Sequence, residues 1–226
     1  MKKESKIFID ALDKEFCSNA NADIAIQQEA YMKNQFEFFG IKTPLRRKIQ
    51  QPFLINKYLP PKDELEEIVK FLWKKPQREF HYFAQEFAFR YVKNLQINDI
   101  QWMEHLIVHQ SWWDTVDFIA PKLIGNFFLK FPEKRDEYLT KWLTSNNIWL
   151  QRSCILFQLK YKDKMDLDTL TMVIESLQNS KEFFINKAIG WILRERSKST
   201  PDWVMDFVEN HELSNLSRKE ALRLIL

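Results

Sequence analysis

Apolar residues recur along most of the chain every three or four positions, which is the spacing of one face of a helix. The clearest example is the segment of residues 181–197, whose apolar stripe consists of Ile185, Ala188, Ile189 and Ile192. No run of strand length alternates apolar and polar residues. The pattern therefore predicts an all-α protein with about a dozen helices of about 10–18 residues.

Short motifs predict where several of these helices begin. Thr43–Pro44 and Thr200–Pro201 each have the pattern of an N-cap residue followed by a proline in the first turn. Ser217, with Glu220 three residues later, matches the capping box of a helix N-terminus. We expect a helix to start at each of these three positions.

Weak self-similarity predicts a repeated unit. Three segments share an aromatic start, a polar step and an apolar run, and they begin at Trp112, Ile148 and Phe183. These starts are 36 and 35 residues apart, which is the length of one helical hairpin in an α-solenoid. A segment from Arg78 is similar and predicts an earlier copy. We expect stacked hairpins that present one helix of each pair on a concave surface, with a closed helical bundle as the alternative architecture.

The composition fits a folded protein and excludes some nucleotide-binding classes. Of the 226 residues, 45% are hydrophobic and 15% are aromatic, so the chain can bury a large core. Only three glycines occur, and neither a Walker-type nor a Rossmann-type glycine motif is present. The formal net charge of +3 is compatible with a nucleic-acid partner but does not require one.

Neither the cysteines nor the histidines indicate a metal site. Cys17 and Cys154 match no metal or redox spacing. His105 and His109 are four positions apart, but the glutamate that accompanies such a pair in zinc hydrolases is missing between them. We therefore expect no metal and no cofactor.

The chain has no feature of a membrane or secreted protein. Its first sixteen residues carry acidic side chains throughout and lack a continuous apolar run, which is unlike a signal peptide. No stretch approaches the ~18 uncharged apolar residues of a membrane span. We expect a cytoplasmic protein without a membrane partner.

The helix predicted over residues 181–197 carries cations and an indole opposite its apolar stripe. These residues, which continue one position beyond the segment, are Lys187, Trp191, Arg194 and Lys198. Cations interleaved with an aromatic ring suit a polyanion with stackable bases, so this face indicates nucleic acid. The alternative is a solvated basic face with one isolated tryptophan.

A second unusual segment, SWWDTVD, begins at Ser111. Trp113 and Asp117 are four residues apart and so share a helix face. Pro121 has no N–H to bond the Asp117 carbonyl, so the helix should be irregular there, which favours a pocket wall. In the alternative interpretation, Trp113 lies in the core and Asp117 caps a helix. Asp114 is the rival carboxylate and suits the first turn of a helix.

Arg152 lies in a segment that is apolar almost all the way round. A guanidinium there needs an anionic partner or access to a groove, and an internal salt bridge is the simpler explanation. Lys160 and Lys162, followed by Lys164, form a basic run after this segment, where the helix dipole also favours cations.

Four segments together resemble one protein family. YMKNQFEFFGIKTPLRR, SWWDTVD, NNIWLQRSCILFQLKYK and SKEFFINKAIGWILRE are similar, in order and spacing, to the AlkD family of bacterial DNA alkylation repair glycosylases. The resemblance runs from about Ile7 to the C-terminus. It implies a single HEAT-like repeat domain over residues 1–226, an α-solenoid with a concave, basic DNA-binding face.

The same resemblance implies an activity. Members of the family hydrolyse the N-glycosidic bond of cationic N3- and N7-alkylpurines, such as 3-methyladenine and 7-methylguanine, in double-stranded DNA without flipping the base. We therefore expect a monomeric, cofactor-free glycosylase of base excision repair in a bacterial cytoplasm. Two alternatives remain open: a non-catalytic paralogue that binds branched or distorted DNA, and a helical scaffold that binds protein.

Residue roles follow from the resemblance where the motifs match. The catalytic positions fall on Asp117, Trp113 and Trp191. The DNA-binding positions fall on Arg152, Arg194, Lys187, Tyr31, Thr43 and Arg47. We add Lys160 and Lys162 to the expected DNA contacts because they belong to the basic run.

Overall fold

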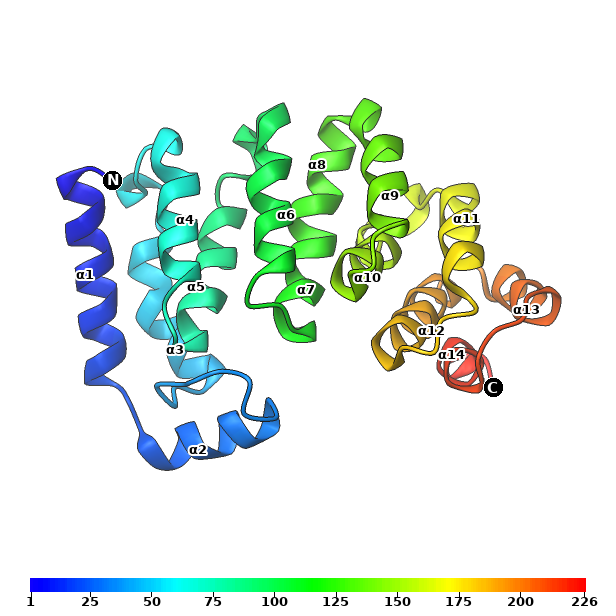
Figure 1. The fold of residues 1–226 in the computed structure, drawn as a ribbon, viewed down its shortest axis with the longest axis horizontal. Coiled ribbons are helices and arrows are strands. Elements are labelled where there is room, and N and C mark those ends of the chain that lie inside the picture. The colour runs from blue at the N-terminus through cyan, green and yellow to red at the C-terminus, as the bar shows by residue number, and fades with distance from the viewer. The chain divides into compact units, whose positions relative to one another are not determined.

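The computed structural model describes all 226 residues, and its regular elements are all helices, with one isolated bridge between Glu37 and Gln77 (Figure 1). The predicted fold class is therefore confirmed. The chain divides into two compact units, Met1–Trp102 and Met103–Leu226, which are called unit 1 and unit 2 below. The single domain over 1–226 and the concave basic face stay predictions.

Unit 1 is built from helices that pack on an aromatic core. Its α-helices are α1 (Lys3–Ser18), α2 (Ala22–Tyr31), α3 (Thr43–Gln50), α4 (Leu65–Trp73), α5 (Arg78–Phe89) and the start of α6 (Ile100–Val108). Short 3-10 turns connect them: η1 (Gln51–Leu54), η2 (Asn56–Tyr58), η3 (Lys62–Glu64), η4 (Val92–Asn94) and η5 (Ile97–Asp99). Phe16 and Phe80, with ring centroids 5.4 Å apart, form part of the core between α1 and α5.

A buried carboxylate fixes the loop between α2 and α3. Glu79, on α5, accepts hydrogen bonds from the backbone N–H groups of Phe39, Gly40 and Ile41, each at 3.0 Å. Gly40 has φ +83°, and a Cβ there would lie 2.0 Å from the Asn21 carbonyl oxygen, so the turn requires glycine. The loop carries part of the first family-like motif, and its conformation depends on one side chain from α5.

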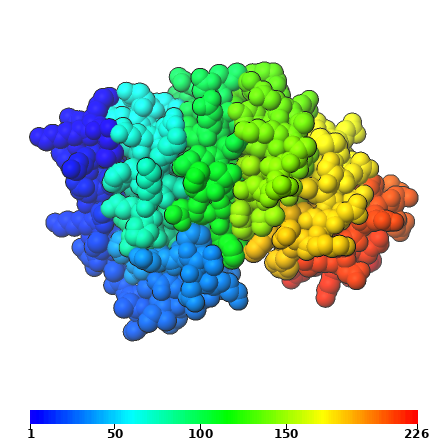
Figure 2. Space-filling view, viewed as in Figure 1, coloured from blue at the N-terminus to red at the C-terminus, as the bar shows by residue number.

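Unit 2 continues the helical pattern. After the remainder of α6 it contains α7 (Trp113–Ile119), η6 (Ala120–Ile124), α8 (Gly125–Lys130), η7 (Pro132–Lys134), α9 (Arg135–Leu143), α10 (Ile148–Leu156), η8 (Lys162–Lys164), α11 (Leu167–Leu177), α12 (Phe183–Ser197), α13 (Pro201–Asn210) and α14 (Asn215–Leu222). In the space-filling view, the red and orange C-terminal segment lies directly against the yellow helices of the same unit (Figure 2).

The repeat predicted from the sequence is present. Helices begin at Arg78, Trp113, Ile148 and Phe183, each within one residue of a predicted segment start. The intervening partner helices are α9 and α11. The predicted apolar stripe of α12 is also confirmed, because Ile185, Ala188, Ile189 and Ile192 are fully buried. The fold is therefore a helical-hairpin repeat.

The backbone irregularity predicted at Pro121 takes the form of a π-turn. Residues Ala120–Ile124, labelled η6, form a π-helical turn between α7 and α8. Because Pro121 cannot donate to the Asp117 carbonyl, the wider turn lets the helix continue without that bond. The interruption also makes α7 and α8 shorter, at seven and six residues, than the predicted range.

Two of the predicted helix starts need correction. Ser214, not Ser217, is the N-cap of α14, and its side chain accepts from the backbone N–H of Ser217. Thr43 is already the first residue of α3 rather than its cap. Thr200 is the N-cap of α13 with Pro201 following, as predicted, although its hydroxyl makes no capping bond.

Ser217 and Glu220 instead face α12. A Cβ at Gly190 would lie 2.5 Å from the Glu220 Cβ and 2.9 Å from the Ser217 carbonyl oxygen, so α12 and α14 approach closely at this glycine. The Ser217 hydroxyl donates to the Asn186 carbonyl at 2.8 Å. The supposed capping box is therefore a tertiary contact, with both side chains used between helices.

We predict that Glu79→Gln destabilises the fold. The amide retains one acceptor oxygen but turns an N–H₂ toward a backbone donor, leaving that buried group unsatisfied at a cost of about 2 kcal/mol. Urea denaturation followed by circular dichroism measures the loss. Glu212→Gln, the same change at an exposed position of unit 2, is the control. Equal stability of the two variants would contradict the role given to Glu79.

Candidate active site

The aspartate predicted to be catalytic lies in a largely buried ion pair. Asp117, on α7, accepts two hydrogen bonds from the Arg152 guanidinium of α10, Nε to Oδ1 at 2.8 Å and Nη2 to Oδ2 at 3.0 Å. The Arg152 side chain is 3% exposed, whereas 18% of the Asp117 side chain remains accessible to solvent. The two parallel bonds fix the plane of the carboxylate.

Arg152 also connects this pair to a third helix. Its Nη1 donates to the backbone carbonyl of Phe184, in the first turn of α12. The three bonds use three of the five guanidinium N–H groups. The internal salt bridge, which the sequence left open as an alternative for Arg152, is thus present, and α7, α10 and α12 meet at one side chain.

Burial changes the titration of Asp117. Desolvation raises the pKa of the Asp117 carboxyl above its ordinary value, and the nearby charge of Asp114 acts in the same direction. The charge and hydrogen bonds of Arg152 oppose this rise. Arg152 is therefore the group that favours the ionised carboxylate.

The two candidate tryptophans lie on the helices that meet at Arg152. Trp113 is the first residue of α7, one turn before Asp117, and Trp191 lies in the middle of α12. Both are partly exposed. The alternative of a core tryptophan and a capping aspartate does not match, because Trp113 is outside the core and Asp117 pairs with Arg152 from within α7.

An aromatic cluster adjoins the ion pair and was not anticipated. The ring centroids of Trp112, Trp149 and Phe184 lie 5.0 to 5.7 Å from one another. The Arg152 guanidinium carbon lies 6.0 Å from the Phe184 ring centroid. These rings come from the aromatic starts of the three repeats, so the repeat itself was the signal that could have found the cluster.

The basic face of α12 is less open than the sequence predicted. Lys187 Nζ lies 2.5 Å from Glu220 Oε2, and Arg194 Nη1 pairs with the other oxygen of the same carboxylate. The Glu220 side chain, on α14, is 8% exposed. One carboxylate thus lies between two of the predicted DNA-binding cations, and Figure 1 shows α14 beside α12.

The other predicted DNA contacts lie at the surface. Lys160 and Lys162 are exposed just after α10, and Lys162 adopts a positive φ of 53°. In unit 1, Tyr31 ends α2, and Thr43 and Arg47 lie on α3, all three exposed. Their roles stay predictions.

No group of three or more His, Cys, Asp and Glu side chains gathers in a way that could hold a metal ion. His105 and His109 stack their rings with centroids 3.9 Å apart.

No helix combines the length and apolar character needed to cross a bilayer.

Two solved structures of helical proteins are similar to this chain. A predicted DNA alkylation repair enzyme from Enterococcus faecalis is 30% identical, with a TM-score of 0.84 over 91% of this chain and 96% of that one. AlkD2 from Streptococcus mutans is 18% identical, with a TM-score of 0.61 over 77% of this chain and 87% of that one. No curated protein matches the chain in sequence.

The model of one family, described as DNA alkylation repair enzyme, matches residues 12–225. The chain therefore belongs to the DNA alkylation repair enzyme family. The resemblance drawn from the four sequence motifs is confirmed at the level of the family.

We predict that Arg152→Met destabilises unit 2 by about 3 kcal/mol, because it leaves the Asp117 carboxylate buried without a partner. Adding Asp117→Asn should recover part of the loss, since it removes the unpaired charge. Chemical denaturation of both variants tests this, with Arg218→Met on the exposed surface of α14 as control. A double variant no more stable than Arg152→Met alone would contradict the coupling.

Proposed function

We propose that this protein is a monofunctional DNA glycosylase that hydrolyses the N-glycosidic bond of cationic N3- and N7-alkylpurines in duplex DNA. The observation that supports the proposal most is the Asp117 carboxylate, which is paired on both oxygens with Arg152 and still partly accessible, in a chain of the DNA alkylation repair enzyme family.

The chemistry needs one carboxylate and no general acid. A purine alkylated at N3 or N7 carries a positive charge, so the base departs as a neutral molecule. Positive charge then develops on the deoxyribose, as in other glycosidic cleavages. An ionised carboxylate near the anomeric carbon stabilises that charge and orients the attacking water.

Asp117 retains the capacity for this role. An ionised carboxylate offers about four lone-pair sites, and the two bonds from Arg152 occupy two of them. Arg152 is thus a positioning residue, because it favours the ionised form of the carboxylate and fixes its plane. The family resemblance also implies a DNA contact for Arg152, which its two remaining guanidinium N–H groups can make only if the 3% exposed side chain becomes accessible when DNA binds.

The tryptophans supply the rest of the proposed catalytic surface. An indole face attracts a developing cation by about 0.5–2 kcal/mol, depending on how completely water is excluded. Trp113 and Trp191 are partly exposed and lie on two of the three helices that meet at Arg152. In this proposal they pack against the sugar of the lesion, and the base is not flipped into a pocket.

Cationic and polar side chains at the surface hold the duplex in register through its phosphates. The proposed contacts in unit 2 are Arg194, Lys187, Lys160 and Lys162, and those in unit 1 are Tyr31, Thr43 and Arg47. Glu220 competes with phosphate for Lys187 and Arg194. We also propose that the protein acts as a monomer in the bacterial cytoplasm.

Asp117→Asn should slow release of 7-methylguanine from a duplex by about 10²-fold or more, because the amide cannot stabilise the developing cation. Single-turnover reactions followed by alkaline strand cleavage at the abasic site measure the rate. Asp114→Asn is the matched control, since it removes the neighbouring carboxylate of the same helix.

Two results would contradict this assignment. If Asp114→Asn abolishes release and Asp117→Asn does not, the carboxylate that acts in the reaction is Asp114. If the wild-type protein releases no base yet binds duplex or branched DNA tightly, the protein is a non-catalytic DNA-binding member of its family.

Excision should also fall as the pH is lowered, because only the ionised carboxylate is active. Burial raises the pKa of Asp117, so the loss should begin above pH ~4, where an ordinary aspartate becomes protonated. A pH–rate profile corrected for release by Asp117→Asn measures this limb. A rate that stays flat down to pH ~4 would contradict a role for this carboxylate.

Glu220→Gln should strengthen binding to undamaged duplex several-fold and steepen its salt dependence, because Lys187 and Arg194 lose their shared carboxylate. Fluorescence anisotropy over a salt series measures both quantities, with Glu212→Gln as the control for loss of an exposed carboxylate. Weaker binding by Glu220→Gln would show that Glu220 orients the cations instead of masking them.

A further inference from the structure

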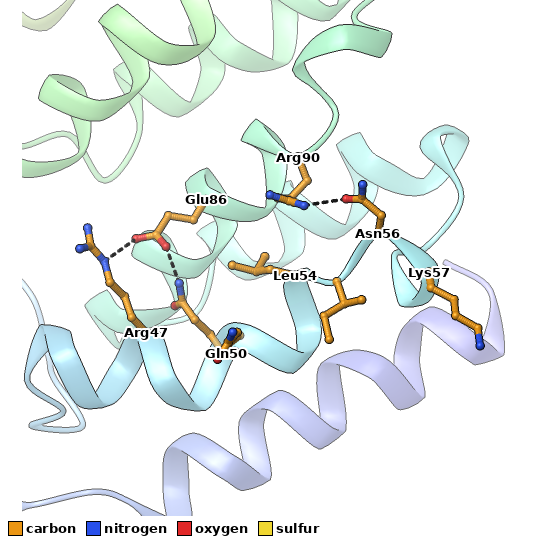
Figure 3. Close-up of a pocket in the computed structure, with 9 residues that line it drawn as sticks. Arg47, Gln50, Leu54, Asn56, Lys57, Glu86 and Arg90 are labelled. Carbon is orange, nitrogen blue, oxygen red and sulfur yellow. Dashed lines mark hydrogen bonds and ion pairs between the residues drawn. The ribbon is translucent and has the colours of Figure 1, made fainter.

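A concave site in unit 1 gathers three outer cations, Arg47, Lys57 and Arg90, around a single carboxylate, Glu86. It encloses about 580 Å³ between α3, the turns η1 and η2, and the C-terminal end of α5 (Figure 3). Its polar lining includes Arg47, Gln50, Asn56, Lys57, Glu86 and Arg90.

The one carboxylate of this lining is already neutralised from within the fold. Glu86 accepts from Gln50 Nε2 at 2.5 Å and from Arg46 Nη2 at 3.2 Å. Arg46 is buried, and its guanidinium carbon lies 4.9 Å from the Tyr82 ring centroid. A buried guanidinium requires such a partner, so the charge of Glu86 is committed to Arg46.

The three outer cations are therefore in excess. The nearest carboxylate contact of Arg47 is 3.9 Å, from its Nε to Glu86. Arg90 donates from Nη2 to the neutral Asn56 amide oxygen at 2.7 Å and has no carboxylate within ion-pair distance. Lys57 also lacks a carboxylate partner and extends outward from η2 at the rim (Figure 3).

Asn56 orients Arg90 without neutralising it. The Asn56 amide oxygen that accepts from Arg90 carries no net charge, so the guanidinium is held in place with its full charge. Arg47 and Arg90 stand on either side of Glu86, and their planar N–H groups match the oxygens of a phosphate (Figure 3). Such an arrangement favours an anion with several oxygens.

We infer that this site binds a backbone phosphate of duplex DNA, with Arg90 and Lys57 as contacts beside Arg47. The inference rests on the proposed DNA binding but not on the chemistry of Asp117. It adds a phosphate site in unit 1 that involves Asn56, Lys57 and Arg90, none of which the sequence motifs indicated.

The test measures binding of undamaged duplex over a salt series, so that it does not depend on base release. Arg90→Gln and Lys57→Gln should each weaken binding several-fold and lower the slope of log K against log salt by about one. Lys70→Gln removes the same charge from a lysine paired with Glu66 at 2.7 Å and should leave the slope unchanged.

Asn56→Asp gives a second test that keeps Arg90 in place. The two side chains have the same shape, and the position is exposed, so the fold should be retained. The new carboxylate pairs with Arg90 and should weaken duplex binding as much as Arg90→Gln does.

Unchanged duplex binding by both Arg90→Gln and Asn56→Asp would overturn the inference. The inference would also be overturned if calorimetry showed that the site binds free deoxynucleoside monophosphate and if the variants weakened that binding without changing duplex binding. If the wild-type protein releases no base but the variants change the salt dependence of duplex binding as expected, the proposed glycosylase activity is overturned and the phosphate site is supported.

Discussion

The bidentate pair between Asp117 and Arg152 is the interaction on which the arrangement of unit 2 depends. The guanidinium is almost completely buried and bonds to groups from both α7 and α12, so it fixes three consecutive repeats at one point. A buried charge is costly unless its partners are complete. The pair that stabilises the helices therefore also favours the ionised form of one carboxylate, fixes its plane and leaves it partly accessible, on helices that also carry two partly exposed tryptophans.

The positive charges on α12 and those at the concave site of unit 1 are compensated by carboxylates to different extents. On α12, Lys187 and Arg194 share the buried carboxylate of Glu220, so an incoming phosphate must compete for them. In unit 1, Glu86 is the one carboxylate of the site and pairs with the buried Arg46 and, at 3.9 Å, with Arg47, whereas Lys57 and Arg90 have no carboxylate partner. Electrostatic attraction of DNA should therefore begin where the charge is free, while the pairs on α12 exchange partners only when the duplex is in place.

The elements with a local signal could be predicted from the sequence. The segments that begin at Arg78, Trp112, Ile148 and Phe183 share a pattern that predicts the starts of four helices. Pro121 predicts the irregular turn, because the effect of its missing N–H is confined to one helix. The pairing of Asp117 with Arg152 spans 35 residues, and that of Lys187 with Glu220 spans 33, so no local pattern reveals them. The local pattern around Ser217 therefore predicts a capping box, whereas Glu220 pairs with Lys187 and Arg194 of α12. The excess charge around Arg90 likewise depends on a fold that brings α3, η2 and the end of α5 together.

The most direct test compares a charged with a neutral leaving base in otherwise identical duplexes. One duplex carries 7-methylguanine and the other uracil at the same position, and release by the wild-type protein is followed under single-turnover conditions. A site with one carboxylate and no general acid predicts release of the methylated base and none of the uracil. Efficient release of uracil, or release of neither base, would contradict the account.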